Sequence, residues 1–139
     1  MKKCREIAIT LSLIGVINAS LLGFYLSTTL FEMIPLFSKK EIRNFYYLHF
    51  TLIIFVTIII VFLTSLGTYF FWKKSFRRGG MFNIFGGIML LMVYLYYYFI
   101  FQPSLLAWLG LFGYILPLLS VLSGCFGVLI KSNVKVSEK

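Results

Sequence analysis

Charged side chains are scarce in this sequence. Asp, Glu, Lys and Arg make up 12% of its 139 residues, whereas a soluble globular domain carries about 25%. Hydrophobic residues make up 60%, and the mean hydropathy is +0.96. With so few charges the chain cannot present a water-soluble surface around a core of this size, so the composition excludes an ordinary soluble domain.

Acidic residues are the rarest charged type, at four in the whole chain, and none lies inside an apolar run. Ionisable groups buried in a membrane are the usual markers of proton relays and ion paths. The small four-span drug exporters, for example, couple protons to transport through a Glu in the first span. In this chain Ser12, Gly15 and Asn18 occupy that region, which argues against an exporter of that class.

Histidine and cysteine are also rare. The single histidine is His49, and the two cysteines, Cys4 and Cys125, are far apart in the sequence. These residues lack the spacing of a zinc or redox site, and no nucleophile in an apolar run has a base and an orienting partner near it. We therefore expect no metal, no cofactor and no enzymatic activity.

Apolar sequence is abundant, and it is arranged in four runs at about 7–30, 48–71, 81–101 and 105–130. Each run reaches the roughly 20 residues that a helix needs to cross the hydrocarbon core of a bilayer. We predict an all-α polytopic membrane protein in which four transmembrane helices form two antiparallel hairpins in a compact bundle. Little sequence remains outside the runs, so residues 1–139 should form a single domain.

Three connections join the runs. The longest predicted connection is 31–44, the second is the turn at 72–80, and the third is the short turn at 102–104; a polar tail follows at 131–139. The turn at 72–80 contains Lys73, Lys74, Arg77 and Arg78 and no acid. Because basic residues beside a span are retained on the cytoplasmic side, this turn sets the expected orientation of the chain.

The other basic residues support the same orientation. Ten Lys and Arg residues flank the runs on the side of that turn, and three lie on the other side, in 31–44. We therefore expect a multi-pass protein of the cell (plasma) membrane with both termini in the cytoplasm. The net charge of +9 then indicates contact with anionic lipid headgroups, chiefly through Lys73, Lys74, Arg77 and Arg78. It does not indicate binding to nucleic acid, because the basic residues do not form a polar face with aromatic residues among them.

Small residues recur at helical spacing in three of the runs. They are Ser12, Gly15, Ala19 and Gly23 in the first; Asn83 and Gly87, continued by Leu90, Tyr94, Tyr97 and Phe101, in the third; and Gly110, Gly113, Pro117, Ser120, Gly124 and Gly127 in the fourth. Spacings of three and four residues place such positions on one face of a helix, and small faces let helix backbones approach closely in membranes. We interpret these faces as packing seams of the bundle. The alternative is that one of them forms an interface between subunits.

Three polar side chains are candidates for a binding site: Asn18, Glu32 and His49. Asn18 lies in the middle of a run, where the default role is a hydrogen bond to another helix. Glu32 and His49 are expected near the outer surface, where they could line a shallow outward-facing site and His49 could respond to pH. A lone histidine at a membrane interface is more often an anchor, so the structural interpretation is preferred. The tyrosine-rich segment 94–98 is typical of an interfacial aromatic belt.

The second half of the chain combines the basic turn Lys73-Lys74-Ser75-Phe76-Arg77-Arg78, the glycine pairs Gly79-Gly80 and Gly86-Gly87, and a closing segment Gly124-Cys125-Phe126-Gly127-Val128-Leu129-Ile130-Lys131. This arrangement, with the basic N-terminal flank, resembles a group of uncharacterised prokaryotic four-span membrane proteins of unknown function. The resemblance implies the architecture and brings no activity or site residues with it. The chain departs from the group in its heavy Phe and Tyr content.

These features favour a non-enzymatic scaffold or accessory subunit that associates through its glycine-rich helix faces, with a membrane-protein partner or as a homo-oligomer. The alternative is an oligomeric pore or small-solute carrier, of a holin-like or permeation type. A self-protection role against membrane-active peptides is a third possibility, although no residue specifies it.

Overall fold

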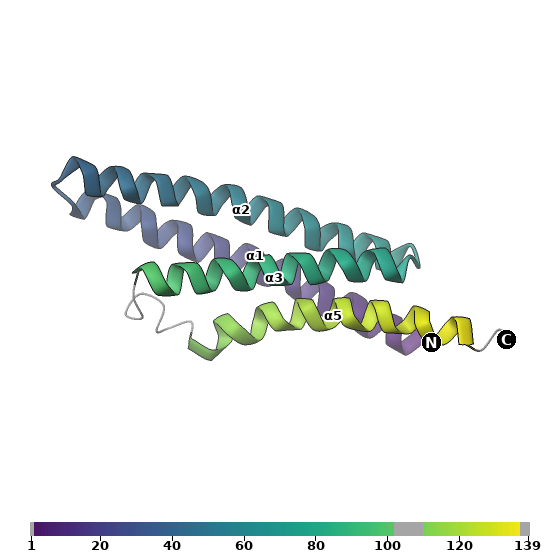
Figure 1. The fold of residues 1–139 in the computed structure, drawn as a ribbon. Helices are drawn as coiled ribbons and strands as arrows, with labels where there is room; N and C mark the ends of the chain where they lie inside the picture. Colours follow the sequence, from purple (N-terminus) through teal and green to yellow (C-terminus); the bar gives the residue numbers. More distant parts are fainter. Residues whose placement is uncertain (1, 102–109, 137–139) are drawn as a thin grey trace.

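The structure is a computed structural model that describes residues 2–101 and 110–136, and the side chains of residues 5–100, 115 and 117–129. Within this part the chain forms α1 (Lys2–Met33), the 3₁₀ turn η1 (Ile34–Leu36), α2 (Lys40–Trp72), α3 (Phe76–Phe101) and α5 (Gly110–Val136), and no strand (Figure 1). The prediction of an all-α fold is therefore confirmed.

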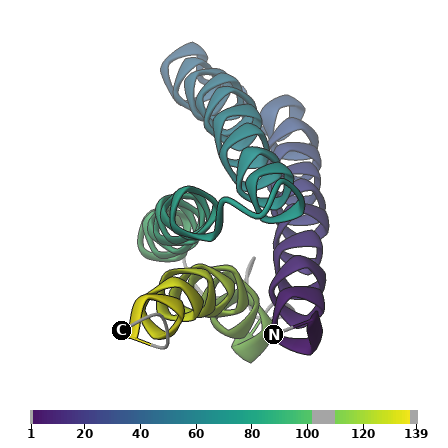
Figure 2. The same ribbon diagram turned by 90° about the vertical axis from the view of Figure 1, so that its right-hand side faces the viewer.

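The four helices form a ring in the order α1, α2, α3, α5 (Figure 2). Each helix packs against its two neighbours in the ring, whereas the diagonal pairs, α1 with α3 and α2 with α5, contact each other little. Neighbouring helices run antiparallel, so the N-terminal end of α1, the α2–α3 turn and the C-terminal end of α5 lie together (Figure 1). We call this the basic end, because Lys73, Lys74, Arg77 and Arg78 lie there.

Three helices are long and apolar enough to cross a membrane, over Arg5–Leu36, Lys40–Trp72 and Phe76–Ile100. With 32 and 33 residues, α1 and α2 are each roughly 50 Å long, which exceeds the ~30 Å of the hydrocarbon core. The described apolar section of α5 is shorter, at Pro117–Leu129. By this criterion the described residues contain three helices that could span a membrane, and the fourth span stays a prediction.

The predicted connection at 31–44 is wrong in its extent. Helix α1 continues to Met33 and α2 begins at Lys40, so only residues 37–39 separate η1 from α2. The charged segment 40–44 starts α2 because Lys, Glu and Arg are good helix formers. Glu41 in addition lies in the first turn, where the helix dipole favours an acid. The charges there mark the end of the apolar run and not the end of the helix.

The predicted turn at 72–80 is also too long, because only residues 73–75 lie between α2 and α3. Lys74 has a positive φ of 61°, and its N–H donates to the Phe71 carbonyl. Gly79 and Gly80 belong to α3, where they allow close packing: a Cβ on Gly80 would lie 2.6 Å from the backbone oxygen of Gly124. These glycines therefore serve contact between helices, and Lys74 makes the turn.

The remaining boundaries concern the second hairpin. The predicted turn at 102–104 and the start of the fourth run at Leu105 lie outside the described residues. Helix α5 continues to Val136, beyond the expected end at Ile130. The helix therefore includes residues 131–136 of the polar tail. The end of the apolar run at Ile130 does not mark the end of the helix.

The interior of the bundle has an apolar half and a polar half. The apolar core lies toward the end opposite the basic end and consists of Ala19, Leu22, Leu26, Leu30, Ile53, Ile60, Leu90, Tyr94 and Tyr97. Of the buried polar side chains, Asn18 lies near the middle of α1 and His49 lies toward the opposite end. The others lie nearer the basic end, and they are Ser12, Thr64, Asn83, Ser120 and Ser123. Large apolar side chains also cover the outside, and Phe24 and Phe99, for example, are 70% and 77% exposed.

Candidate functional site

A buried polar cluster joins three helices in the half of the bundle near the basic end. Ser12 on α1 donates a hydrogen bond to Oδ1 of Asn83 on α3 at 2.9 Å, and the Ser12 oxygen lies 2.6 Å from the Thr68 hydroxyl on α2. The Thr68 hydroxyl also lies 3.0 Å from the Thr64 carbonyl oxygen, to which it donates, and in the contact between Ser12 and Thr68 either hydroxyl can be the donor. One serine therefore links α1 to both α2 and α3.

Asn83 is positioned by contacts from α1, α2 and α5. Gly67 of α2 makes room for its side chain, since a Cβ at Gly67 would lie 2.6 Å from Nδ2 of Asn83. Ser120 of α5 donates to the backbone carbonyl of Asn83 at 3.4 Å. Among the described residues Nδ2 has no hydrogen-bond partner, and an unpaired amide N–H in apolar surroundings costs free energy. The position of Asn83 is therefore set by packing and by bonds to its two oxygen atoms.

Helix α5 contacts α1 through small hydroxyl side chains. Ser123 donates to the backbone carbonyl of Ala8 at 2.9 Å, and both residues are fully buried. Closer to the middle of the bundle, Gly15 faces Ser120, and a Cβ at Gly15 would lie 2.9 Å from the Ser120 hydroxyl oxygen. The short side chains bring the two helices close enough for a side chain to reach the backbone of the neighbouring helix.

The predicted packing residues face other helices of the same chain. The pairs are Gly15 with Ser120, Gly23 with Thr57, Gly87 with Val121, Gly124 with Gly80, and Gly127 with Phe71. Ala19 is fully buried in the apolar core. A Cβ on Gly124 would lie 2.5 Å from the backbone oxygen of Gly80, closer than Cβ atoms come in real proteins. Gly110 and Gly113 belong to α5 but lie outside the residues whose surroundings are described.

A second polar cluster lies nearer the opposite end, between α2 and α3. Buried His49 has Nδ1 2.8 Å from the Phe45 carbonyl oxygen and Nε2 3.0 Å from the Tyr96 hydroxyl. A carbonyl only accepts, so in the neutral ring Nδ1 carries the proton and Tyr96 donates to Nε2. Tyr97 donates to the backbone carbonyl of His49 at 2.9 Å. Two consecutive tyrosines therefore bind the side chain and the main chain of one histidine.

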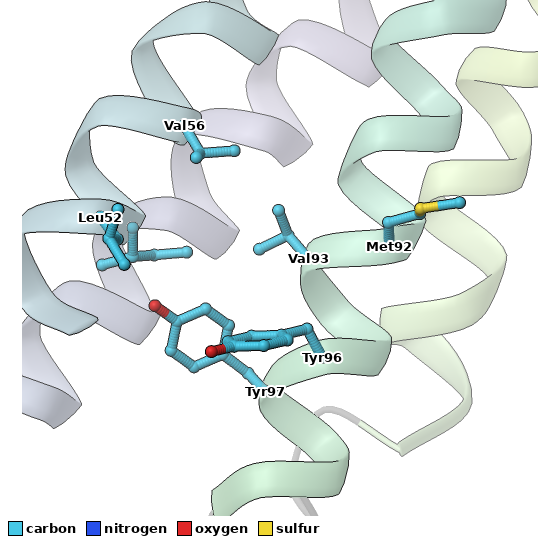
Figure 3. A pocket seen from close by; sticks show the side chains of 7 residues that line it. Leu52, Val56, Met92, Val93, Tyr96 and Tyr97 are labelled. Atoms are coloured by element: carbon cyan, nitrogen blue, oxygen red, sulfur yellow. The ribbon is translucent and has the colours of Figure 1, made fainter.

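An apolar groove of about 420 Å³ lies beside this cluster, between α2 and α3 (Figure 3). It is lined by Leu52, Ile53, Val56, Met92, Val93, Tyr96 and Tyr97. Its volume is in the range of small-molecule sites. Both tyrosine hydroxyls are hydrogen-bonded to His49, so the groove offers an occupant mainly apolar contact.

The structure does not bring the three predicted polar-site residues together. Glu32 is exposed and lines a separate groove of about 370 Å³ between α1 and α2. His49 is buried and bonds to Tyr96 of α3, whereas the next residue, Phe50, lines the Glu32 groove. Asn18 is 8% exposed, and its Nδ2 has no partner among the described residues. The outward-facing site with both Glu32 and His49 is therefore not formed.

The basic residues at the α2–α3 turn point away from the bundle. Lys73, Lys74, Arg77 and Arg78 are all exposed. The Nζ atom of Lys73 lies 5.2 Å from the centre of the Tyr69 ring. Interaction with the Tyr69 side chain, chiefly hydrogen bonding, raises the pKa of Lys73 above its ordinary value of 10.5. Lys73 therefore carries its charge throughout the neutral pH range.

The described residues contain no group of three His, Cys, Asp or Glu side chains placed to hold a metal ion. Cys125 on α5 is a free, exposed thiol.

Comparisons of the chain with protein-family models, with curated proteins and with solved structures gave no match. The resemblance noted in the sequence therefore depends on spacing alone.

The sequence indicated several members of the two polar clusters but not the hydrogen bonds between them. Ser12 and Asn83 were both placed on packing seams, and His49 was singled out, but Thr68 and the bond from Tyr96 to His49 were not anticipated. The available signal was that Ser12, Thr68 and Asn83 all lie in the half of their helices nearer the basic end. Polar residues in the same part of a membrane bundle are natural hydrogen-bond partners.

Proposed function

We propose that this chain is a four-span integral membrane protein of the cell membrane, with both termini in the cytoplasm, and that it serves without catalysis as a scaffold or accessory subunit for other membrane proteins. The three long apolar helices support insertion, and α5 supplies the fourth span. The exposed basic residues at one end, which suit contact with anionic headgroups, support the orientation.

The observation that carries this proposal is where the chain uses its small residues. The described seam glycines face side chains or backbone of the chain's own helices, and the buried hydroxyls of Ser12 and Ser123 bond inside the bundle. These contacts favour the interpretation that the seams pack the helices of one bundle. They argue against the alternative, in which a glycine-lined seam forms an interface between subunits. A filled interior leaves the outer surface for other molecules, so a partner should contact exposed apolar residues such as Phe55 and Phe62 on α2.

The test is gentle solubilisation from native membranes, followed by crosslinking and mass spectrometry of the proteins that co-purify. A photoreactive residue at exposed Phe55 should capture a stoichiometric membrane-protein partner. The same residue at Ile53, which is 1% exposed on the same helix, is the matched control and should form crosslinks only within the chain. Recovery of the chain alone, as a defined oligomer, would contradict the accessory role.

The second candidate is an oligomeric pore or small-solute carrier. The polar half of the interior, with Ser12, Asn83 and Ser120, favours it. The apolar half opposes it, because buried Leu26, Tyr94 and neighbouring residues fill the rest of the bundle. Liposomes containing the purified protein should therefore retain ions and small dyes at every protein density. Release that rises with density would favour the pore.

A further inference from the structure

The α2–α3 turn carries the densest group of positive charges among the described side chains. Lys73, Lys74, Arg77 and Arg78 are exposed within six consecutive residues, and neither the turn nor the first turn of α3 contains an acid. The other cluster of described cations, Lys39, Lys40 and Arg43 at the opposite end, has Glu41 among its members. The α2–α3 turn therefore differs from the cluster at the opposite end in having no acid among its cations.

The position of the two arginines adds to the electrostatic repulsion among the four cations. Arg77 and Arg78 lie in the first turn of α3, where the positive end of the helix dipole disfavours cations. Two lysines immediately before them add like charge. Of the described acids, Glu32 and Glu41 lie at the other end of the bundle, and only Glu6 on α1 lies toward the basic end. An anion from outside the chain would relieve this repulsion.

The surface next to the cations is aromatic and apolar. Trp72 is 72% exposed and Tyr69 is 48% exposed, and both belong to the last turn of α2. Lys73 lies over the Tyr69 ring, so a cation and an exposed ring are already in contact. A free anion would match only the basic residues. A molecule with a negative headgroup and an apolar body would match the basic and the aromatic parts together.

We propose that the α2–α3 turn is a binding site for an anionic phospholipid. Its phosphate would contact Lys73, Lys74, Arg77 and Arg78, and its glycerol and upper acyl chains would lie against Trp72 and Tyr69. This inference rests on the proposed membrane insertion and goes beyond it. General attraction between basic residues and a membrane leaves lipids exchanging freely, whereas this site keeps a lipid through purification.

The test is native mass spectrometry of the detergent-purified chain after incubation with phosphatidylglycerol or phosphatidylcholine. The chain should retain phosphatidylglycerol and release phosphatidylcholine. In the double variant K73Q/K74Q, binding of phosphatidylglycerol should weaken roughly 30-fold, because each lysine near an anionic headgroup contributes about a five-fold factor. The matched control K39Q/K40Q removes the same residue pair from the opposite end and should leave binding unchanged.

Equal retention in the two lysine variants, or equal loss, would overturn the proposal. The variant K73R/K74R keeps the charge and should bind as the original chain does, which separates loss of charge from damage to the turn at Lys74. Complete displacement of the lipid by an equal concentration of glycerol phosphate would overturn the role of Trp72 and Tyr69. Topology labelling of the same variants tests the proposed orientation separately, so failure of either proposal can be recognised.

Discussion

Ser12 of α1 and Asn83 of α3 are joined by a hydrogen bond of 2.9 Å across the diagonal of the bundle. Helices α1 and α3 otherwise contact each other little, because α2 and α5 lie between them in the ring. The bond therefore relates the first hairpin directly to the second. Lipid tails offer no competing donor or acceptor, so a bond of this kind can set how far one hairpin slides past the other.

We predict that Ser12 and Asn83 are energetically coupled. In a double-mutant cycle with Ser12→Ala and Asn83→Ala, the coupling should be about 1 kcal/mol, as found for hydrogen bonds between membrane helices. The measurement is the free energy of unfolding in mixed detergent micelles. Ser20→Ala is the matched control, since exposed Ser20 bonds only to Val16 in its own helix. Its effect should be additive with that of Asn83→Ala.

The close approach of α3 and α5 predicts a strong effect of Gly124→Leu. The new side chain would collide with the backbone oxygen of Gly80 and with Ile84, which belong to a packed helix and cannot move away cheaply. Destabilisation of about 1–3 kcal/mol is expected, measured as the temperature at which the detergent-solubilised protein aggregates. Cys125→Leu changes the adjacent, exposed position and should have little effect. Equal tolerance of both changes would show that these backbones do not meet.

The contacts of His49 predict its tautomer. The neutral ring should carry its proton on Nδ1, which nitrogen chemical shifts of labelled histidine report directly. Tyr96→Phe removes the donor to Nε2 and should lower the free energy of unfolding by about 1 kcal/mol. Tyr47→Phe alters an exposed tyrosine of α2 and serves as the control. A proton found on Nε2 in the neutral ring would contradict the assigned contact with the Phe45 carbonyl.

The number of spans is predicted to be four, and the location of the C-terminus decides it. An even number places both termini on one side, and an odd number places them on opposite sides. A fluorescent protein fused after Lys139 should therefore fold and fluoresce in the cytoplasm, whereas an alkaline phosphatase fused there should be inactive. The same phosphatase inserted at residues 37–39 should be active. Activity at the C-terminus would mean that α5 does not cross the membrane.

The helical class followed from the apolar runs, because few structures other than helices satisfy the backbone of so apolar a chain. The spacing of three and four residues also predicted which side chains face the interior. Four residues placed on the seams are buried, and they are Ser12, Leu90, Tyr94 and Ser120. Helix ends could not be predicted from hydropathy, as segment 40–44 and Gly79-Gly80 show, because hydropathy reports the surroundings of a residue rather than its backbone. The pairing of Ser12 with Asn83, and of His49 with Tyr96, depends on how far one helix is displaced along the axis of its neighbour. The sequence of a single helix does not determine that displacement.

The connection between α1 and α2 is only a few residues long, so in the proposed topology the first hairpin can enter the membrane while the second is still being made. At that stage Ser12 contacts Thr68 of α2 but lacks its bond to Asn83, and Gly15 lacks its neighbour Ser120 of α5 and faces lipid. We expect a nascent hairpin with an uncovered glycine face to be a substrate for an insertase or for proteolysis. The protein should consequently depend on rapid completion of translation, and truncation after Trp72 should yield a short-lived fragment.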